Sequence, residues 1–106
     1  MSASKIRLTT PTRLVLDVLM SAGDTPAWGY RICEIARLGS GTVYPILERL
    51  EEAGWIEGAW EIDQPGDRPR RRFYTLTGTG RAGYAAAVAA HRQRNPWRVE
   101  PRRGLA

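Results

Sequence analysis

The chain has 106 residues, of which 42% are hydrophobic and 25% are charged, and its formal net charge is +5. This length suits one domain with a modest core, and its apolar stretches are far shorter than the roughly 20 residues that cross a bilayer. The charged start has no apolar run behind it, so we expect no signal peptide and a cytoplasmic protein. The basic balance favours an acidic partner such as nucleic acid.

Residue types suited to catalysis or metal binding are scarce. Cys33 is the only cysteine and His91 is the only histidine, so an internal disulfide and a thiolate metal site are excluded. The GxGxxG string that begins at Gly78 lacks the strand and helix context of a dinucleotide site, and we interpret it as a chance match. We therefore expect no catalytic residues, no metal and no cofactor.

The first part of the chain predicts two helices. Thr10 as N-cap, Pro11 as the first helical residue and Gly23 as C-cap delimit the first helix. Its apolar face is expected to contain Leu14, Val15, Val18 and Leu19. A second, short helix is expected over about Ala27 to Arg37. Its regularly spaced apolar residues are Trp28, Ile32, Ile35 and Ala36.

A third helix follows the tight exit at Leu38-Gly39. Its apolar stripe has the i, i+3, i+4, i+7 spacing of an amphipathic helix and consists of Val43, Ile46, Leu47 and Leu50. Pro45 limits where this helix begins, because a proline is tolerated in the first turn but costs a hydrogen bond further in. We predict Thr42 as the N-cap rather than Ser40.

After Gly54 the apolar spacing changes from helical to alternating, which predicts a β-hairpin. The first strand is expected to contain Ile56, Trp60 and Ile62. Gln64-Pro65-Gly66-Asp67 is typical of a type II turn, and the residues from Arg70 to Leu76 form the second strand. The fold class is thus mainly α with a small hairpin: three helices, two strands and a final helix, as in a winged helix-turn-helix.

The final helix is rich in alanine and glycine. Thr77 is its predicted cap, and Asn95-Pro96 is its predicted stop. We divide the chain into a winged helix-turn-helix domain at 1–77, a C-terminal helix at 78–95 and a flexible basic tail at 96–106.

The third helix is the candidate recognition helix, because a helix-turn-helix inserts its second helix into the major groove, N-terminal end first. The candidate DNA contacts that it carries are Ser40, Gly41, Thr42, Tyr44, Pro45 and Arg49. Glu48, Glu51 and Glu52 would repel phosphates, so only the first turn is expected to insert. For Tyr44 a place in the core or in a dimer interface remains open.

The hairpin tip is the second candidate contact. Four arginines within five residues lie beside the predicted turn: Arg68, Arg70, Arg71 and Arg72. A basic wing of this kind can follow phosphates or enter a minor groove. The alternative is a solvated basic turn.

These motifs together resemble the PadR family of bacterial winged-helix regulators. The matching strings are Trp28-Gly29-Tyr30, the run from Ser40 to Leu47, Gly54-Trp55-Ile56, Trp60-Glu61 and the run from Arg68 to Thr77. The resemblance implies a repressor that binds a double-stranded operator as a homodimer, paired through its N-terminal and C-terminal helices. The short C-terminal region is similar to that of the small subclass, some of whose members bind flat aromatic compounds; Trp28 and Trp97 are the candidates for such an effector site.

Two departures and one alternative accompany the resemblance. Arg37 stands where the family often has glycine in the turn before the recognition helix, and the long helical domain of larger members is missing. The alternative is a winged-helix module for protein–protein contact, which the acidic run from Glu48 to Asp63 supports. Loss of duplex affinity with rising salt would distinguish a DNA binder from such a module.

Overall fold

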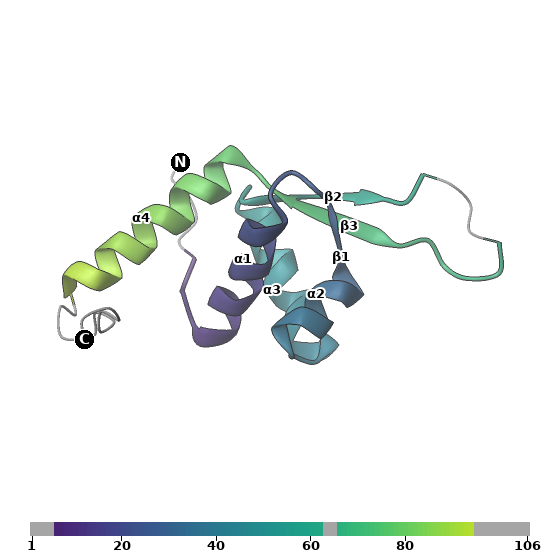
Figure 1. The fold of residues 1–106 in the computed structure, drawn as a ribbon, viewed down its shortest axis with the longest axis horizontal. Helices are drawn as coiled ribbons and strands as arrows, with labels where there is room; N and C mark the ends of the chain where they lie inside the picture. Colours follow the sequence, from purple (N-terminus) through teal and green to yellow (C-terminus); the bar gives the residue numbers. More distant parts are fainter. Residues whose placement is uncertain (1–5, 63–65, 95–106) are drawn as a thin grey trace, which may run out of the picture.

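The computed structural model describes residues 6–62 and 66–94. In these ranges the chain forms α1 (Thr10–Ala22), β1 (Ala27–Trp28), α2 (Gly29–Ala36), α3 (Ser40–Glu52), β2 (Ile56–Trp60), β3 (Arg72–Leu76) and α4 (Gly78–Arg94). The first three helices pack together, the β2–β3 hairpin extends to one side of them, and α4 leaves on the other (Figure 1). This is the predicted mainly helical winged-helix fold with one additional strand.

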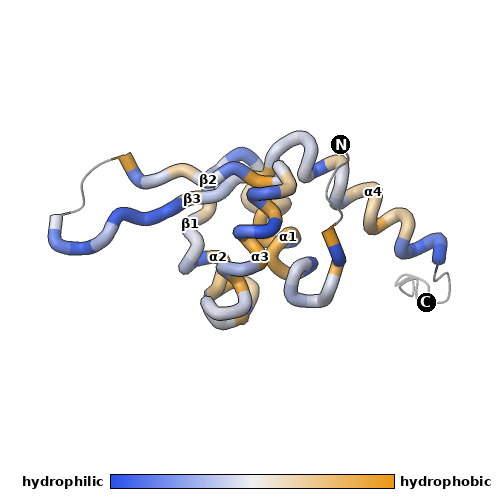
Figure 2. Tube along the Cα trace, turned by 180° about the vertical axis from the view of Figure 1, so that it is seen from behind, coloured by the Kyte–Doolittle hydropathy of each residue, from blue (hydrophilic) through white to orange (hydrophobic). Residues whose placement is uncertain are grey.

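The core lies where α1, α2, α3 and the sheet meet, and the apolar segments of the tube gather there in Figure 2. Its largest fully buried side chains are Val15, Leu16, Leu19, Ile32, Val43, Leu47, Leu50 and Ile56. Two sequence expectations are wrong: Leu14 is 38% exposed and Ile35 is 51% exposed. The buried face of α1 is rotated relative to the predicted one, so that Leu16 is buried in place of Leu14.

The N-terminal cap of α1 is Thr9, not Thr10 as predicted. The Thr9 hydroxyl oxygen accepts from the Thr12 N–H at 3.3 Å and donates to the Thr12 hydroxyl at 3.0 Å. Pro11 therefore occupies the second helical position, where its missing N–H still costs nothing. At the other end Gly23 follows the helix with φ +63°, a positive angle that favours glycine.

The predicted helical start at Ala27 is also wrong, because Ala27 and Trp28 form the short strand β1. They pair antiparallel with Tyr74 and Phe73 of β3, which gives the sheet order β1-β3-β2. β3 is therefore the central strand, and the wing is fastened to the segment that begins α2. We call β2, β3 and the described part of their connection the wing.

The strands of the wing are shorter than predicted, since β2 ends at Trp60 and β3 begins at Arg72. The Glu61 N–H still donates to the Arg71 carbonyl at 2.7 Å, which extends the pairing by one residue. Gly66 has φ +87°, as the third residue of a type II turn requires. The predicted positions Gln64 and Pro65 lie outside the described residues.

Thr77 caps α4 as predicted: its hydroxyl oxygen accepts from the Gly80 N–H at 3.0 Å and donates to the Gly54 carbonyl at 2.7 Å. The first turns of α4 then pack on Trp55 through glycine. A Cβ placed on Gly80 would lie 2.1 Å from the Trp55 carbonyl oxygen, and one on Gly83 would lie 2.5 Å from the Trp55 ring. The predicted stop at Asn95-Pro96 and the tail at 96–106 lie outside the described residues.

Candidate nucleic-acid interface

The turn of the helix-turn-helix is closed by Arg37, which has left-handed backbone angles of φ 61° and ψ 44°. The Arg37 N–H points back to the carbonyls of Cys33 and Glu34, and the Leu38 N–H donates to the Cys33 carbonyl at 3.1 Å. These bonds satisfy the open carbonyls at the end of α2. The turn from α2 to α3 thus requires a conformation that glycine adopts more readily than arginine.

We expect Arg37→Gly to raise the free energy of unfolding by about 0.5–1 kcal/mol, because glycine adopts the left-handed angles without strain. Arg37→Ala is the matched control, since alanine removes the same side chain but keeps a Cβ. Urea denaturation of the three proteins measures the difference. Equal midpoints for the glycine and alanine variants would contradict the strain argument.

The recognition helix begins earlier than predicted, at Ser40, with Gly39 rather than Thr42 as its N-cap. The Gly39 carbonyl accepts from the Thr42 N–H and from the Val43 N–H, both at 3.0 Å. This first turn forms ahead of Pro45, which consequently lies inside the helix. The buried stripe of Val43, Ile46, Leu47 and Leu50 agrees with the prediction and holds the helix in place.

The side of α3 opposite this stripe is open to solvent. The candidate residues that α3 exposes are Ser40, Gly41, Thr42, Tyr44, Pro45 and Arg49. Glu48 and Glu52 are exposed on the same helix, further along it. The end of the helix that carries the fewest carboxylates is therefore its N-terminal end, which also has the positive pole of the helix dipole.

Tyr44 is 40% exposed, and its ring packs against the start of α2. A Cβ placed on Gly29 would lie 2.6 Å from the Tyr44 hydroxyl oxygen, so Gly29 makes room for this ring. Burial raises the pKa of Tyr44, and the nearby Cys33 raises it further. The hydroxyl therefore stays protonated at neutral pH and can donate to a phosphate. The contact between Gly29 and Tyr44 could not be predicted from the sequence, in which Gly29 stands out only as part of the Trp28-Gly29-Tyr30 string.

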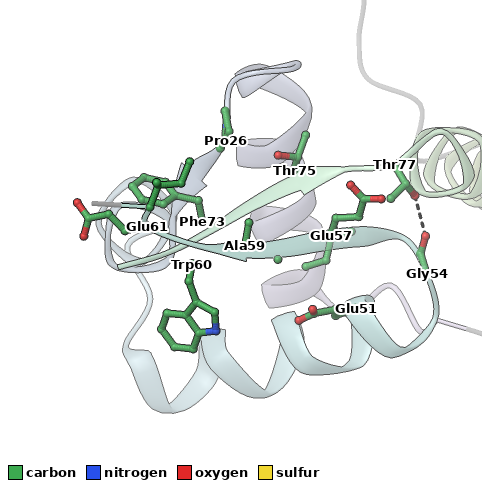
Figure 3. A pocket seen from close by; sticks show the side chains of 13 residues that line it. Pro26, Glu51, Gly54, Glu57, Ala59, Trp60, Glu61, Phe73, Thr75 and Thr77 are labelled. Atoms are coloured by element: carbon green, nitrogen blue, oxygen red, sulfur yellow. Dashed lines mark hydrogen bonds between the residues drawn. The ribbon is translucent and has the colours of Figure 1, made fainter. Parts of the chain in front are cut away.

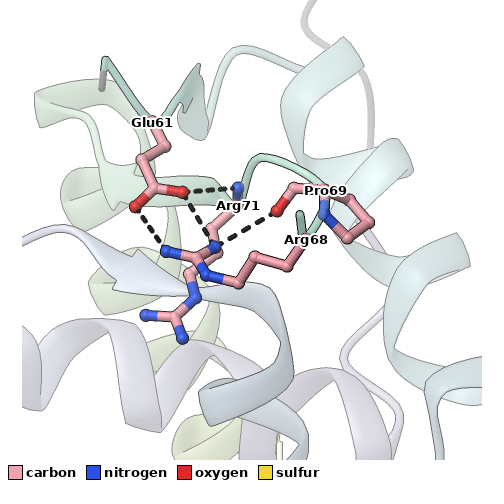
Figure 4. Close-up of polar contacts among 4 residues, drawn as sticks. All are labelled: Glu61, Arg68, Pro69 and Arg71. Atoms are coloured by element: carbon pink, nitrogen blue, oxygen red, sulfur yellow. Dashed lines mark hydrogen bonds and ion pairs between the residues drawn. The ribbon is translucent and has the colours of Figure 1, made fainter. Parts of the chain in front are cut away.

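Glu61 organises the base of the wing connection (Figure 4). Its carboxylate oxygens accept from both Arg68 guanidinium nitrogens at 3.0 Å, and one of them also accepts from the Arg71 N–H at 3.1 Å. Arg68 additionally donates to the Pro69 carbonyl at 3.1 Å. The hydrogen bonds from Arg68, and then that from Arg71, hold the pKa of Glu61 below its usual value. Glu61 belongs to the Trp60-Glu61 string of the family resemblance, but its role in binding the wing arginines was not predicted from the sequence.

The other wing arginines have different surroundings, although the sequence places them side by side. The Arg71 guanidinium carbon lies 3.8 Å from the Trp28 ring centre, and Arg71 Nε is buried with no hydrogen-bond partner among the described residues. Arg72 pairs with Glu51 of α3 at 2.8 Å. Arg70 is exposed. The structure thus separates the four arginines instead of presenting them on one surface.

Other functional features are sparse in the part of the chain that the structure describes. In residues 6–62 and 66–94 no group of three or more histidine, cysteine, aspartate or glutamate residues could hold a metal ion. Within the same ranges no helix is long and apolar enough to cross a membrane. Of the two tryptophans considered for an aromatic effector, Trp28 is covered by Arg71, and Trp97 lies outside the described residues.

A helix-turn-helix followed by a basic hairpin defines the class of winged-helix DNA-binding proteins. The family model for the transcriptional regulator PadR-like family matches residues 18–86, which is more than half of the chain. The protein therefore belongs to the PadR-like family of transcriptional regulators.

Solved structures agree with this assignment. A PadR-like transcription factor from Bacteroides fragilis is 26% identical, with a TM-score of 0.62, and the match covers 82% of this chain and 87% of that one. A probable transcriptional regulator from Pseudomonas aeruginosa is 27% identical, with a TM-score of 0.66 and coverage of 85% and 63%. A PadR family regulator from Clostridium difficile has a TM-score of 0.67 at 23% identity and covers 84% and 94%, so it supports the fold alone. No curated protein sequence matches the chain.

Proposed function

We propose that this protein is a sequence-specific, dimeric repressor that binds a promoter operator through the first turn of α3 and the wing. The observation that carries the proposal is the crevice between α3 and the wing. Its lining residues are Tyr44, Pro45, Glu48, Glu51, Arg72 and Tyr74. The part of α3 from Tyr44 to Glu51 and the second strand of the wing therefore border one surface, which a duplex that meets both elements would also contact.

The residue roles that we propose follow from this surface. Thr42 and Tyr44 are suited to contact base edges and nearby phosphates. Ser40 and Gly41 bring the N–H groups of the helix start close to the DNA backbone. Arg49 extends from the exposed side of α3 and is suited to a phosphate. In the wing we assign the phosphate contact to Arg70, which is exposed, and to Arg68, which is also exposed although it pairs with Glu61. Arg71 and Arg72 instead hold the wing against β1 and α3.

The proposed dimer rests on the exposure of α4. Among the residues from Gly78 to Arg94, only Gly80 and Tyr84 are buried. Tyr84 donates to Asp17 of α1 at 2.5 Å, which fixes the start of α4 while its later turns project from the body (Figure 1). A long helix of small residues that is held at one end is suited to pack against a partner's helices. Dimerisation would place two recognition helices on one duplex, with a palindromic operator as the expected target.

A salt titration of duplex binding tests the DNA contact. We expect the affinity to fall steeply between about 50 and 200 mM salt, because bound arginines release counterions from phosphates. Arg70→Ala should reduce the slope of log affinity against log salt by about one, whereas Arg31→Ala on α2 serves as a charge-matched control. Arg31 is exposed and pairs only weakly with Glu34, at 3.4 Å.

Selection of bound duplexes from a random pool tests the sequence preference and the symmetry of the site. Two related half-sites would support the dimer. If the wild-type protein binds no duplex at low salt, the protein–protein module becomes the better interpretation.

A further inference from the structure

The face of the wing that is turned toward α3 carries an exposed tryptophan. Trp60 ends β2 and is 58% exposed, and Ile62, two residues further on, is 90% exposed. In Figure 3 the Trp60 ring lies on the α3 side of the hairpin, together with Glu51, whereas Ala59 and Thr75 lie on the opposite side. Single exposed apolar residues are common on protein surfaces, so exposure alone does not distinguish Trp60; the way in which its ring is held does.

Trp60 is tied to the recognition helix through Arg72. The two residues are opposite each other in the β2–β3 register, and the Arg72 guanidinium carbon lies 5.0 Å from the Trp60 ring centre. Arg72 is in turn paired with Glu51 of α3 at 2.8 Å. The Trp60 indole therefore has the Arg72 cation on one side. Glu51 of α3, a helix outside the wing, fixes this cation.

Gly58 makes this arrangement possible. A Cβ placed on Gly58 would lie 2.6 Å from an Arg72 guanidinium nitrogen, so the glycine leaves the space in which the arginine crosses the strand. Arg72 also pairs with Glu51, a carboxylate in the last turn of α3. The result is an ordered aromatic ring beside Arg72, which lines the crevice between α3 and the wing.

We propose that Trp60 makes an apolar contact with the deoxyribose edge of the DNA backbone when the first turn of α3 enters the major groove. This inference rests on the proposed function. The ring is large, it is held by Arg72 before binding, and Arg72 itself lines the crevice together with Tyr44 and Pro45. Because the contact involves no charge, it adds affinity that does not depend on salt, in contrast to the contact of Arg70.

Duplex binding by Trp60→Ala at several salt concentrations tests the proposal. We expect affinity about tenfold lower at every salt concentration, a magnitude typical of lost aromatic contacts with nucleic acid, and a salt slope equal to that of the wild type. Trp60→Phe should retain most of the affinity. Ile35→Ala is the control for loss of an exposed apolar side chain, because Ile35 is 51% exposed on α2 and belongs to neither α3 nor the wing.

Four results would overturn the proposal. If Trp60→Ala binds the duplex with wild-type affinity, Trp60 makes no DNA contact, but the proposed repressor function is unaffected. A shallower slope shows that the variant acts through Arg72 and its charge. If Trp60→Ala dimerises more weakly in analytical ultracentrifugation, and its DNA affinity falls only as much as the loss of dimer explains, Trp60 belongs to a protein interface. Absence of duplex binding by the wild type overturns the proposed function together with this contact.

Discussion

Gly80→Ala is expected to lower the free energy of unfolding by about 2–3 kcal/mol, the upper part of the range for overpacked sites. The new Cβ would lie 2.1 Å from the Trp55 carbonyl oxygen and 2.8 Å from its carbonyl carbon. Both are backbone atoms next to β2, so neither can move aside as a side chain would. The helix would have to lift away from Trp55, which is 7% exposed and packed beneath it.

Gly78→Ala is the matched control, because a Cβ at that position meets nothing within 4 Å. Replacement of glycine by alanine at an unstrained helical position usually stabilises by about 0.5–1 kcal/mol. Thermal and urea denaturation of both variants should therefore give shifts of opposite sign. Equal behaviour of the two variants would mean that α4 is not seated on Trp55 as described.

The seating of α4 on Trp55 also affects the proposed dimer. Trp55 and the Tyr84–Asp17 hydrogen bond set the direction in which α4 leaves the winged helix. If α4 pairs two subunits, a lifted helix changes the spacing of the two recognition helices. We expect Gly80→Ala to weaken operator binding at temperatures where the variant is still folded, although Gly80 lies far along the chain from α3.

Leu47→Ala is expected to destabilise the protein by about 2–5 kcal/mol, as for other large buried side chains that are truncated. Leu47 is 1% exposed and belongs to the stripe that fastens α3 to α1 and α2. A small domain has only about 5–15 kcal/mol of stability in total. The melting temperature should therefore fall by many degrees, and DNA binding should disappear with the fold rather than before it.

The neighbouring residue provides the contrast. Glu48 is exposed and borders the crevice with Tyr44 and Pro45. Glu48→Ala should change stability by no more than about 0.5 kcal/mol and should strengthen binding to any duplex, because a carboxylate near phosphates is removed. Calorimetry and duplex titration of both variants separate the two roles. Weakened binding by Glu48→Ala would show that this carboxylate contacts a base, for instance a cytosine amino group.

Much of the fold follows from local patterns. The stripe of α3 from Val43 to Leu50 could be predicted because four apolar residues at helical spacing can be buried together only in a helix. The positive φ of Gly23 and Gly66 could be predicted because turn chemistry is local. The cap at Thr77 needed only a threonine ahead of a helical segment.

The errors occur where long-range contacts outweigh local preference. β1 has two residues, too few for a periodic pattern, and it exists because β3 offers it a free edge. The start of α3 at Ser40 contradicts the rule for Pro45, since the Gly39 carbonyl and the buried stripe hold the helix despite the proline. The rotated face of α1 likewise depends on which helices cover it.

The candidate interface shows the same division. The sequence by itself determined an amphipathic candidate recognition helix with its glutamates toward the C-terminal end, and a hairpin with four arginines, because charge and spacing along one element are local properties. Only the tertiary structure decided how those arginines are used. Arg68 meets Glu61, Arg71 meets Trp28, and Arg72 joins Glu51 to Trp60. Each of these partners comes from another segment of the chain. Strand register and helix packing bring the partners together, and no local sequence pattern encodes either.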